Sequence, residues 1–131
     1  MSSVAAETSF LCVTDMASGF VFDKSRDSWK SAILTPREKY LVSKSTQKGY
    51  AWEVNEVGSK TPIAACKDDF NEIGILVCEG LKELRMNKNS GRFLAIYAIG
   101  YWNDNKNSKE NDLFREGANT PSMEIGKCSP L

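Results

Sequence analysis

The chain contains no histidine among its 131 residues, and this absence removes several classes of active site. A Ser-His-Asp or Cys-His arrangement cannot form without an imidazole, and no histidine is present to act as a general base. The sequence also lacks a glycine-rich phosphate loop of the Walker or the dinucleotide-binding type. Carboxylates therefore remain as the acid–base groups for any catalysis, and the sequence assigns no catalytic residue.

Net charge and long apolar runs are also absent. Lys+Arg and Asp+Glu number 17 each, so the formal net charge is zero and no global field attracts nucleic acid or an anionic membrane. No apolar run approaches the roughly 18 residues that a bilayer span requires. We therefore expect no nucleic-acid partner and no membrane insertion.

Four cysteines are present, and none belongs to a Cys-x-x-Cys pair. Without histidine, a zinc site would need scattered thiolates or carboxylates, so we expect no metal and no cofactor. We predict one disulfide between Cys12 and Cys128, which ties the chain ends together, and one between Cys66 and Cys78, which brackets a local turn. The alternative is four reduced, buried cysteines in a cytosolic protein.

The cysteines also bear on the compartment and the domain limits. Disulfides predict an extracytoplasmic protein, periplasmic or secreted, whereas reduced cysteines would predict a cytoplasmic one. Residues 1–8 are expected to form a flexible N-terminus, and residues 9–131 a single β-rich domain. Residues 1–7 lack the charged and apolar regions of a signal peptide, although Val4-Ala5-Ala6 has the small residues of a cleavage site.

Strand-like segments recur at spacings of roughly 8–12 residues, with short turns between them. This pattern predicts a mostly β fold, an antiparallel meander that closes into a small barrel or sandwich of about eight strands. Outside the central hairpin, the expected strands cover residues 10–14, 19–23, 29–34, 39–45, 50–57, 63–66 and 122–127.

The expected centre of the fold is a hairpin at 73–102, the most hydrophobic part of the chain. Its two segments, 73–86 and 93–102, are joined by the turn-rich residues 87–91. One short helix at 79–89 is an alternative, because three apolar residues would share one helical face. The β-branched and aromatic content of the stretch favours strands.

A polar connection of seventeen residues, 103–119, carries the binding prediction. Loops of this length inside compact domains are usually functional or disordered. Leu113, Phe114 and Arg115 lie in its middle, and this apolar pair beside an arginine is typical of a partner-binding anchor or a lid. Trp102 at the loop base completes the predicted binding set. The alternative is that Leu113 and Phe114 pack the loop back onto the body.

Three functional hypotheses follow from these observations. The first is a non-catalytic extracytoplasmic binding or inhibitor protein that acts on a protein partner through residues 103–119. The second is a carrier of a small apolar molecule, because a barrel of about eight strands can hold one such ligand. The third is a carboxylate-based hydrolase, which requires an Asp or Glu with a strongly raised pKa in a cleft.

Overall fold

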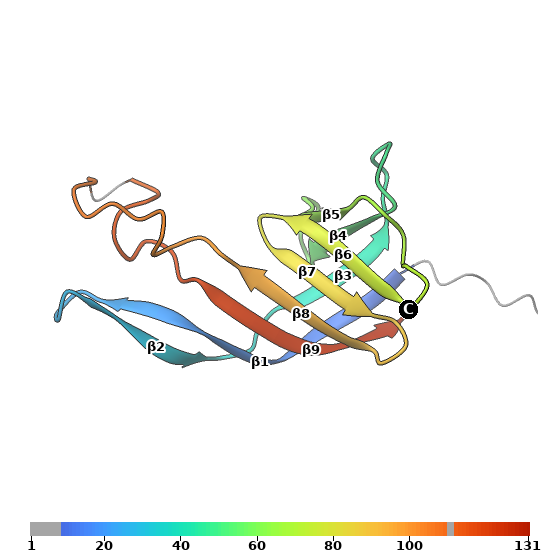
Figure 1. The fold of residues 1–131 in the computed structure, drawn as a ribbon, viewed down its shortest axis with the longest axis horizontal. Helices are drawn as coiled ribbons and strands as arrows, with labels where there is room; N and C mark the ends of the chain where they lie inside the picture. Colours follow the sequence, from blue (N-terminus) through green and yellow to red (C-terminus); the bar gives the residue numbers. More distant parts are fainter. Residues whose placement is uncertain (1–8, 110–111) are drawn as a thin grey trace, which may run out of the picture.

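The structure is a computed structural model that describes residues 9–109 and 112–131, so the expectation for residues 1–8 lies outside it. The described residues form nine β-strands and no helix (Figure 1). The strands are β1 (Ser9–Asp23), β2 (Ser28–Leu34), β3 (Lys39–Lys44), β4 (Trp52–Glu56), β5 (Ala64–Cys66), β6 (Ile75–Gly80), β7 (Glu83–Asn87), β8 (Arg92–Tyr97) and β9 (Ser122–Pro130). The prediction of a mostly β fold is confirmed.

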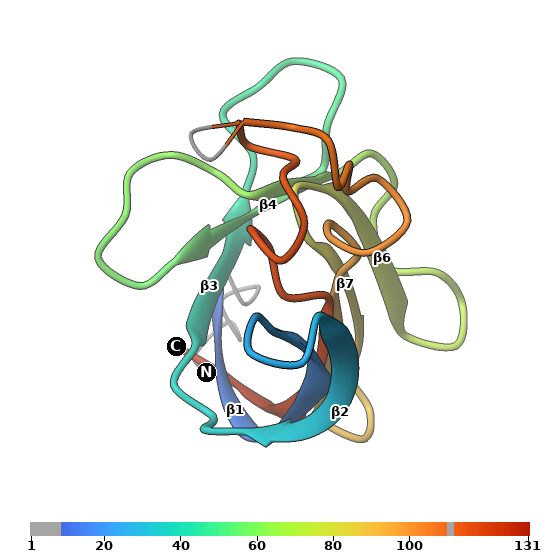
Figure 2. The same ribbon diagram turned by 90° about the vertical axis from the view of Figure 1, so that its left-hand side faces the viewer.

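The strands pair antiparallel in the order β2-β1-β3-β4-β5-β6-β7-β8-β9, and β9 pairs again with β1. Eight strands therefore close a barrel, and β2 is an additional strand beside the far half of β1. Figure 1 shows the β1–β2 hairpin projecting beyond the barrel, on the same side as the long connection from β8 to β9. Figure 2 views the molecule from this side and shows both lying in front of the barrel.

The prediction of separate strands at 10–14 and 19–23 was wrong, because both belong to the 15-residue strand β1. β9 pairs with β1 from Phe10 to Gly19, so the strand continues through the residues 15–18 that separate the two predicted strands. A bulge between Thr14 and Met16 interrupts the register. Bulges bend a strand and increase its twist, which lets the far half of β1 leave the barrel wall and pair with β2.

The prediction of a two-segment hairpin at 73–102 also needs correction. Segment 73–86 divides into β6 and β7, and β8 ends at Tyr97 rather than at residue 102. The division was hidden because Leu81, an apolar residue, occupies the tight turn between β6 and β7, where its side chain is exposed. Because β7 runs through residues 83–87, the alternative helix at 79–89 does not form.

Side chains from every barrel strand fill the interior. Large apolar side chains contribute about 1.5–3 kcal/mol each when fully buried, so this core stabilises the barrel. The buried apolar residues are Phe10, Cys12, Tyr40, Val42, Trp52, Val54, Ala64, Cys66, Leu76, Cys78, Leu84, Met86, Phe93, Ala95 and Cys128. The protein's own side chains thus occupy the space in which a carrier barrel would hold its ligand.

Both predicted disulfides are present, and all four cysteines are paired. Cys12 and Cys128 are directly opposite each other on β1 and β9. Cys66 and Cys78 join the short strand β5 to β6. Each bridge therefore fastens two neighbouring strands of the barrel wall from within the core.

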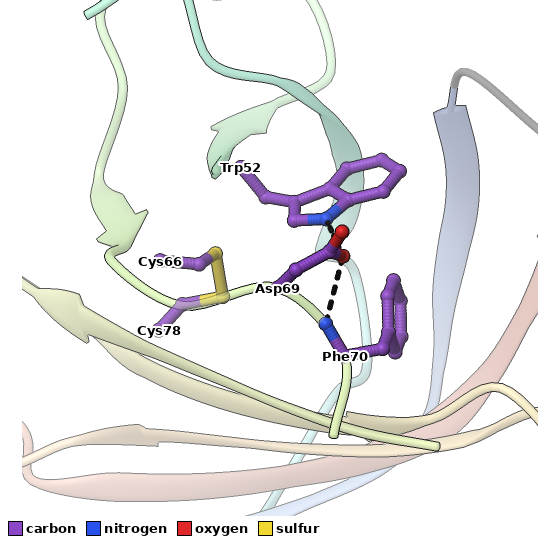
Figure 3. The surroundings of a disulfide bond; sticks show 5 residues. All are labelled: Trp52, Cys66, Asp69, Phe70 and Cys78. Carbon is purple, nitrogen blue, oxygen red and sulfur yellow. Dashed lines mark hydrogen bonds between the residues drawn. A yellow bond between two sulfur atoms is a disulfide. The ribbon is translucent and has the colours of Figure 1, made fainter. Parts of the chain in front are cut away.

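The aromatic side chains of Trp52 and Phe70 pack together near the Cys66–Cys78 bridge (Figure 3). The ring of Phe70, in the connection from β5 to β6, lies 5.4 Å from that of Trp52 in an edge-to-face arrangement. The indole N–H of Trp52 donates to Asp69 Oδ1 at 2.8 Å, and this hydrogen bond lowers the pKa of Asp69. The Phe70 ring thus adds to the apolar packing around Trp52 and the rest of the core.

Candidate functional site

One mouth of the barrel holds a buried polar cluster. The Tyr40 hydroxyl donates to Glu124 Oε1, and Lys82 Nζ lies 2.6 Å from the Tyr40 oxygen and 3.2 Å from Glu124 Oε1. Thr14 donates to the other carboxylate oxygen at 3.4 Å. Burial, together with the hydrogen bond and charge of Glu124, raises the pKa of Tyr40. Both oxygens of Glu124 have partners, as buried polar groups in stable folds do, so the cluster serves the packing of the mouth.

A pair of glutamates lies beside this cluster. Glu56 is directly opposite Tyr40 in the β3–β4 pairing, and a hydrogen bond shared with Glu56 raises the pKa of Glu38. Partial burial adds to the rise, and the charge of Lys82 opposes it. A hydrolase requires such a raised pKa within a cleft, but the two cavities described for the structure are lined by neither Glu38, Glu56 nor Glu124.

Replacing Glu38 by glutamine is expected to stabilise the protein at neutral pH. A carboxyl group whose pKa is higher in the folded than in the unfolded state destabilises the fold once it ionises. The stability of the protein should therefore fall as the pH rises from 4.5, the ordinary pKa of glutamate, through the raised pKa of Glu38. In the Glu38→Gln variant, position 38 cannot ionise, so this decrease in stability does not occur. Its gain over wild type should be below about 1 kcal/mol, because both carboxylates are partly exposed.

Thermal unfolding measured between acidic and neutral pH checks this expectation. The difference between Glu38→Gln and wild type should vanish at a pH below the ordinary glutamate value and reach its full size at neutral pH. Glu79→Gln is the matched control, because Glu79 is an exposed residue of β6. A gain for Glu38→Gln that is equally large at acidic pH would contradict the explanation by the raised pKa of Glu38.

The outer surface of β2, β1, β9 and β8 carries a continuous row of mostly apolar side chains. The strand registers place Ile33 opposite Ser18, Ser18 opposite Met123, and Met123 opposite Ile96. A groove of about 950 Å³ lies over this row, between the β1–β2 hairpin and the segment that leaves β8. We call it the aromatic groove. It is lined by Ser18, Gly19, Phe20, Trp29, Lys30, Ser31, Ile96, Tyr97, Ala98, Gly100, Tyr101, Trp102, Pro121, Ser122 and Met123.

Two neighbouring aromatic residues project at the rim of this groove. Trp102 is 74% exposed, and its indole N–H donates to the Ala98 carbonyl at 2.6 Å, which fixes the orientation of the ring. Tyr101 has a φ of 59°, and the Trp102 N–H donates to the Gly100 carbonyl at 2.7 Å across it. A three-residue turn with a non-glycine residue at positive φ is strained. The backbone thus holds two large rings at the surface instead of in the core.

Trp29 links the groove to the long loop. Its ring lies 5.6 Å from that of Phe22 and 5.6 Å, edge to face, from that of Tyr101. Its indole N–H donates to Glu116 Oε1 at 3.0 Å. Loop residue Gly117 approaches the ring of Phe22 so closely that a Cβ added there would clash with it. The loop is therefore fastened to the β1–β2 hairpin through residues 116 and 117.

The structure separates the four predicted binding residues into two groups. Trp102 lines the aromatic groove, whereas Leu113, Phe114 and Arg115 lie farther along the loop and do not line it. Leu113 is 75% exposed and Phe114 43% exposed, so both side chains present apolar surface to solvent.

Arg115 makes its hydrogen bonds within the loop. Its backbone forms a bridge with Asn105, and its guanidinium donates to the Asp112 carbonyl at 3.2 Å. The Phe114 carbonyl also accepts a hydrogen bond from the Asn105 N–H at 2.7 Å. These contacts keep the two sides of the loop together, so Arg115 helps to shape the loop.

No protein-family model matches this chain, and no curated protein or solved structure compared with it does either. Within residues 9–109 and 112–131, no helix is long and apolar enough to cross a membrane. The same residues contain no group of three or more His, Cys, Asp or Glu side chains that could hold a metal ion.

Sequence reasoning missed several groove residues. Phe20 and Met123 come from strands that are far apart in the chain and neighbours in the sheet, so only the β1–β9 pairing reveals that they share a face. Tyr101 had a local signal, because it directly follows Gly100, and glycine is common in tight turns. A second hollow of about 660 Å³, lined in part by Met16 and Ile125, continues the exposed apolar surface along β1 and β9.

Proposed function

We propose that this protein is a non-catalytic, extracytoplasmic binding protein that holds a partner protein in the aromatic groove. The observation that carries the proposal is the groove itself, which has a volume of about 950 Å³ and the exposed rings of Tyr101 and Trp102 at its rim. Large exposed apolar patches on soluble proteins mark interaction sites, and tryptophan and tyrosine dominate the binding energy of protein interfaces.

The loop at 103–119 provides a second contact area beside the groove. Leu113 and Phe114 expose apolar surface there, and the hydrogen bond from Trp29 to Glu116 holds the loop near the groove. A filled barrel with two disulfides is a rigid base for both areas, so little conformational entropy is lost when a partner binds. If the partner is an enzyme and this loop enters its active site, the protein acts as an inhibitor of that enzyme.

The two disulfides support the extracytoplasmic part of the proposal. Both bridges cross the core, and structural disulfides persist in oxidising compartments such as the periplasm or the extracellular space. Fractionation of cells that produce the protein, followed by mass measurement with and without reductant, tests this location. Reduced cysteines in a cytoplasmic fraction would contradict it.

Replacing Trp102 by alanine is expected to weaken partner binding by about 30-fold or more, the effect of removing an interface residue that dominates binding. The partner is first captured from the extracytoplasmic fraction with a photo-crosslinking amino acid at position 102, with the same amino acid at Ile73 as the control. Calorimetry then compares wild type with Trp102→Ala and with Leu113→Ser/Phe114→Ser. These substitutions are preferable to deleting 113–115, which would remove the backbone bridge between Arg115 and Asn105.

The matched control for binding is Val77→Ser, because Val77 is an exposed apolar residue of β6 that lines neither cavity. Val77→Ser should bind as wild type does, and the Leu113→Ser/Phe114→Ser variant should lose affinity to a smaller degree than Trp102→Ala. Unchanged affinity in Trp102→Ala, with the fold intact by circular dichroism, would contradict the proposed role of the groove.

A carrier of a small apolar molecule is the second candidate, and the size of the groove favours it. Pockets for small ligands have volumes of roughly 300–1,000 Å³ and mostly apolar linings. Because the barrel interior is filled, such a ligand would bind outside the barrel, in the aromatic groove. Native mass spectrometry of protein purified without organic solvent distinguishes the two candidates: a stoichiometric small-molecule adduct, lost in Trp102→Ala, favours the carrier over the protein-binding role.

A further inference from the structure

Strand β2 has one hydrogen-bonded edge and one open edge. It pairs with β1 along its whole length, from Ser28 to Leu34, and it is the last strand in the sheet order. Within the described residues, no other strand pairs with it, and no backbone hydrogen bond joins its open edge to another segment. An open strand edge presents unpaired N–H and C=O groups and is a template for pairing with another chain.

The composition of β2 lacks most of the devices that keep an open edge from pairing. Its seven residues include no proline and a single charged side chain, Lys30. Ile33 is 94% exposed, although isoleucine is among the residues most often buried. A fully exposed isoleucine on an open edge gives this edge an apolar surface that a further strand would cover.

We propose that β2 pairs with β2 of a second copy of this chain, as antiparallel strands centred on Ser31. Two identical surfaces related by a two-fold axis form a self-complementary interface. If one residue of the first copy contacts a second residue of the partner, then the second residue of the first copy contacts the first residue of the partner. Ser31 is the middle residue of Ser28–Leu34, so this is the register that pairs all seven residues of both strands.

Side chains match in this register. Trp29 lies opposite the partner's Ile33, Lys30 lies opposite the partner's Ala32, and the two Ser31 hydroxyls meet at the axis. Aromatic and β-branched pairs stabilise neighbouring strands, and so do hydrogen bonds between hydroxyls. A register centred on Lys30 would place two lysines opposite each other, and one centred on Ile33 would leave most of both strands unpaired. The zero net charge of the chain means that two copies do not repel each other overall.

The second copy would also extend the aromatic groove. Trp29, Lys30 and Ser31 line the groove, and the proposed pairing sets the partner's Ile33 directly beside Trp29. The apolar row that runs from Ile96 to Ile33 would then continue onto the neighbouring sheet. A dimer formed in this way joins two barrels through one continuous sheet and places their two grooves on the same side. The inference concerns the β2 edge and does not depend on what the groove binds.

A charge-swap experiment tests both the pairing and its register. Ser31 is exposed, so lysine or aspartate at this position leaves the barrel core unchanged. In the proposed dimer, Ser31→Lys places two positive charges opposite each other at the axis, and Ser31→Asp places two negative ones. Each variant alone should dimerise at least about tenfold more weakly than wild type, and their 1:1 mixture should form a heterodimer of at least wild-type affinity. Val77→Lys is the control and should dimerise as wild type does.

Sedimentation equilibrium from about 1 µM to about 1 mM protein covers the range of weak to moderate association. The expected result is a wild-type monomer–dimer equilibrium, its loss in both single variants, and its return in the mixture. Wild-type protein that stays monomeric over the whole range overturns the proposal and leaves the β2 edge to a strand from a different protein. Dimers that persist in Ser31→Lys, or a mixture that does not associate, also overturn it, because the contact would then lie elsewhere or in another register.

Discussion

Replacing Cys12 and Cys128 together by alanine is expected to lower the free energy of unfolding by about 4–5 kcal/mol. The bridge joins residues 116 positions apart, so it restricts nearly the whole unfolded chain. In the chain-entropy description, the stabilisation grows with the logarithm of the closed loop. Domains of this size have a total stability of about 5–15 kcal/mol, so this variant should be close to unfolding at physiological temperature.

The second bridge provides an internal control for this prediction. Cys66 and Cys78 are 12 positions apart and are also buried, so replacing both by alanine should lower stability by about 3 kcal/mol. Urea unfolding at constant protein concentration measures both variants and wild type. If removal of the short bridge is the more damaging change, strain or packing around Cys66 outweighs chain entropy, and the loop-length argument does not hold for this protein.

The disulfide pairing was predictable from the sequence because few arrangements were possible. Four cysteines allow three disulfide pairings, and the absence of histidine disfavours a zinc site as their role. Cys12 and Cys128 lie near opposite ends of the chain. The strand positions were predictable for a related reason: alternating apolar residues such as Trp52 and Val54 must face a core when the intervening residues are polar. The alternation of apolar residues is a local signal, and the disulfide pairing was a choice among a small number of arrangements.

The aromatic groove and the open edge of β2 were not predictable in this way. Both depend on the bulge between Thr14 and Met16, which sends the far half of β1 out of the barrel wall to pair with β2. The groove then combines residues from β1, β2, β8 and β9, whose common face follows from the sheet register. A single sequence does not encode register between distant strands in any local pattern. Trp102 was found because it stands at the base of a conspicuous loop.

Replacing Lys82 by methionine is expected to destabilise the protein by about 3–5 kcal/mol, the range observed when one partner of a buried ion pair is removed. Lys82 Nζ lies 3.2 Å from Glu124 Oε1, and the two side chains are 15% and 6% exposed. Lys82 also lies 5.0 Å from the centroid of the Tyr40 ring, where its charge is attracted to the aromatic face. Methionine keeps the length of the side chain but leaves the Glu124 carboxylate without a nearby positive charge.

A double-mutant cycle separates the uncompensated charge from simple loss of packing. In Lys82→Met/Glu124→Gln, the glutamine amide still accepts the hydrogen bond from the Tyr40 hydroxyl and carries no charge, so the double variant should be more stable than Lys82→Met by about 1–3 kcal/mol. Lys127→Met is the matched control, because the Lys127–Asp15 pair has the same 3.2 Å separation at an exposed position, and its loss should be below about 1 kcal/mol. Urea unfolding of the four proteins in the cycle and the control gives these differences. If the double variant is no more stable than Lys82→Met, Lys82 stabilises the barrel mouth through its packing on Tyr40 rather than through its charge.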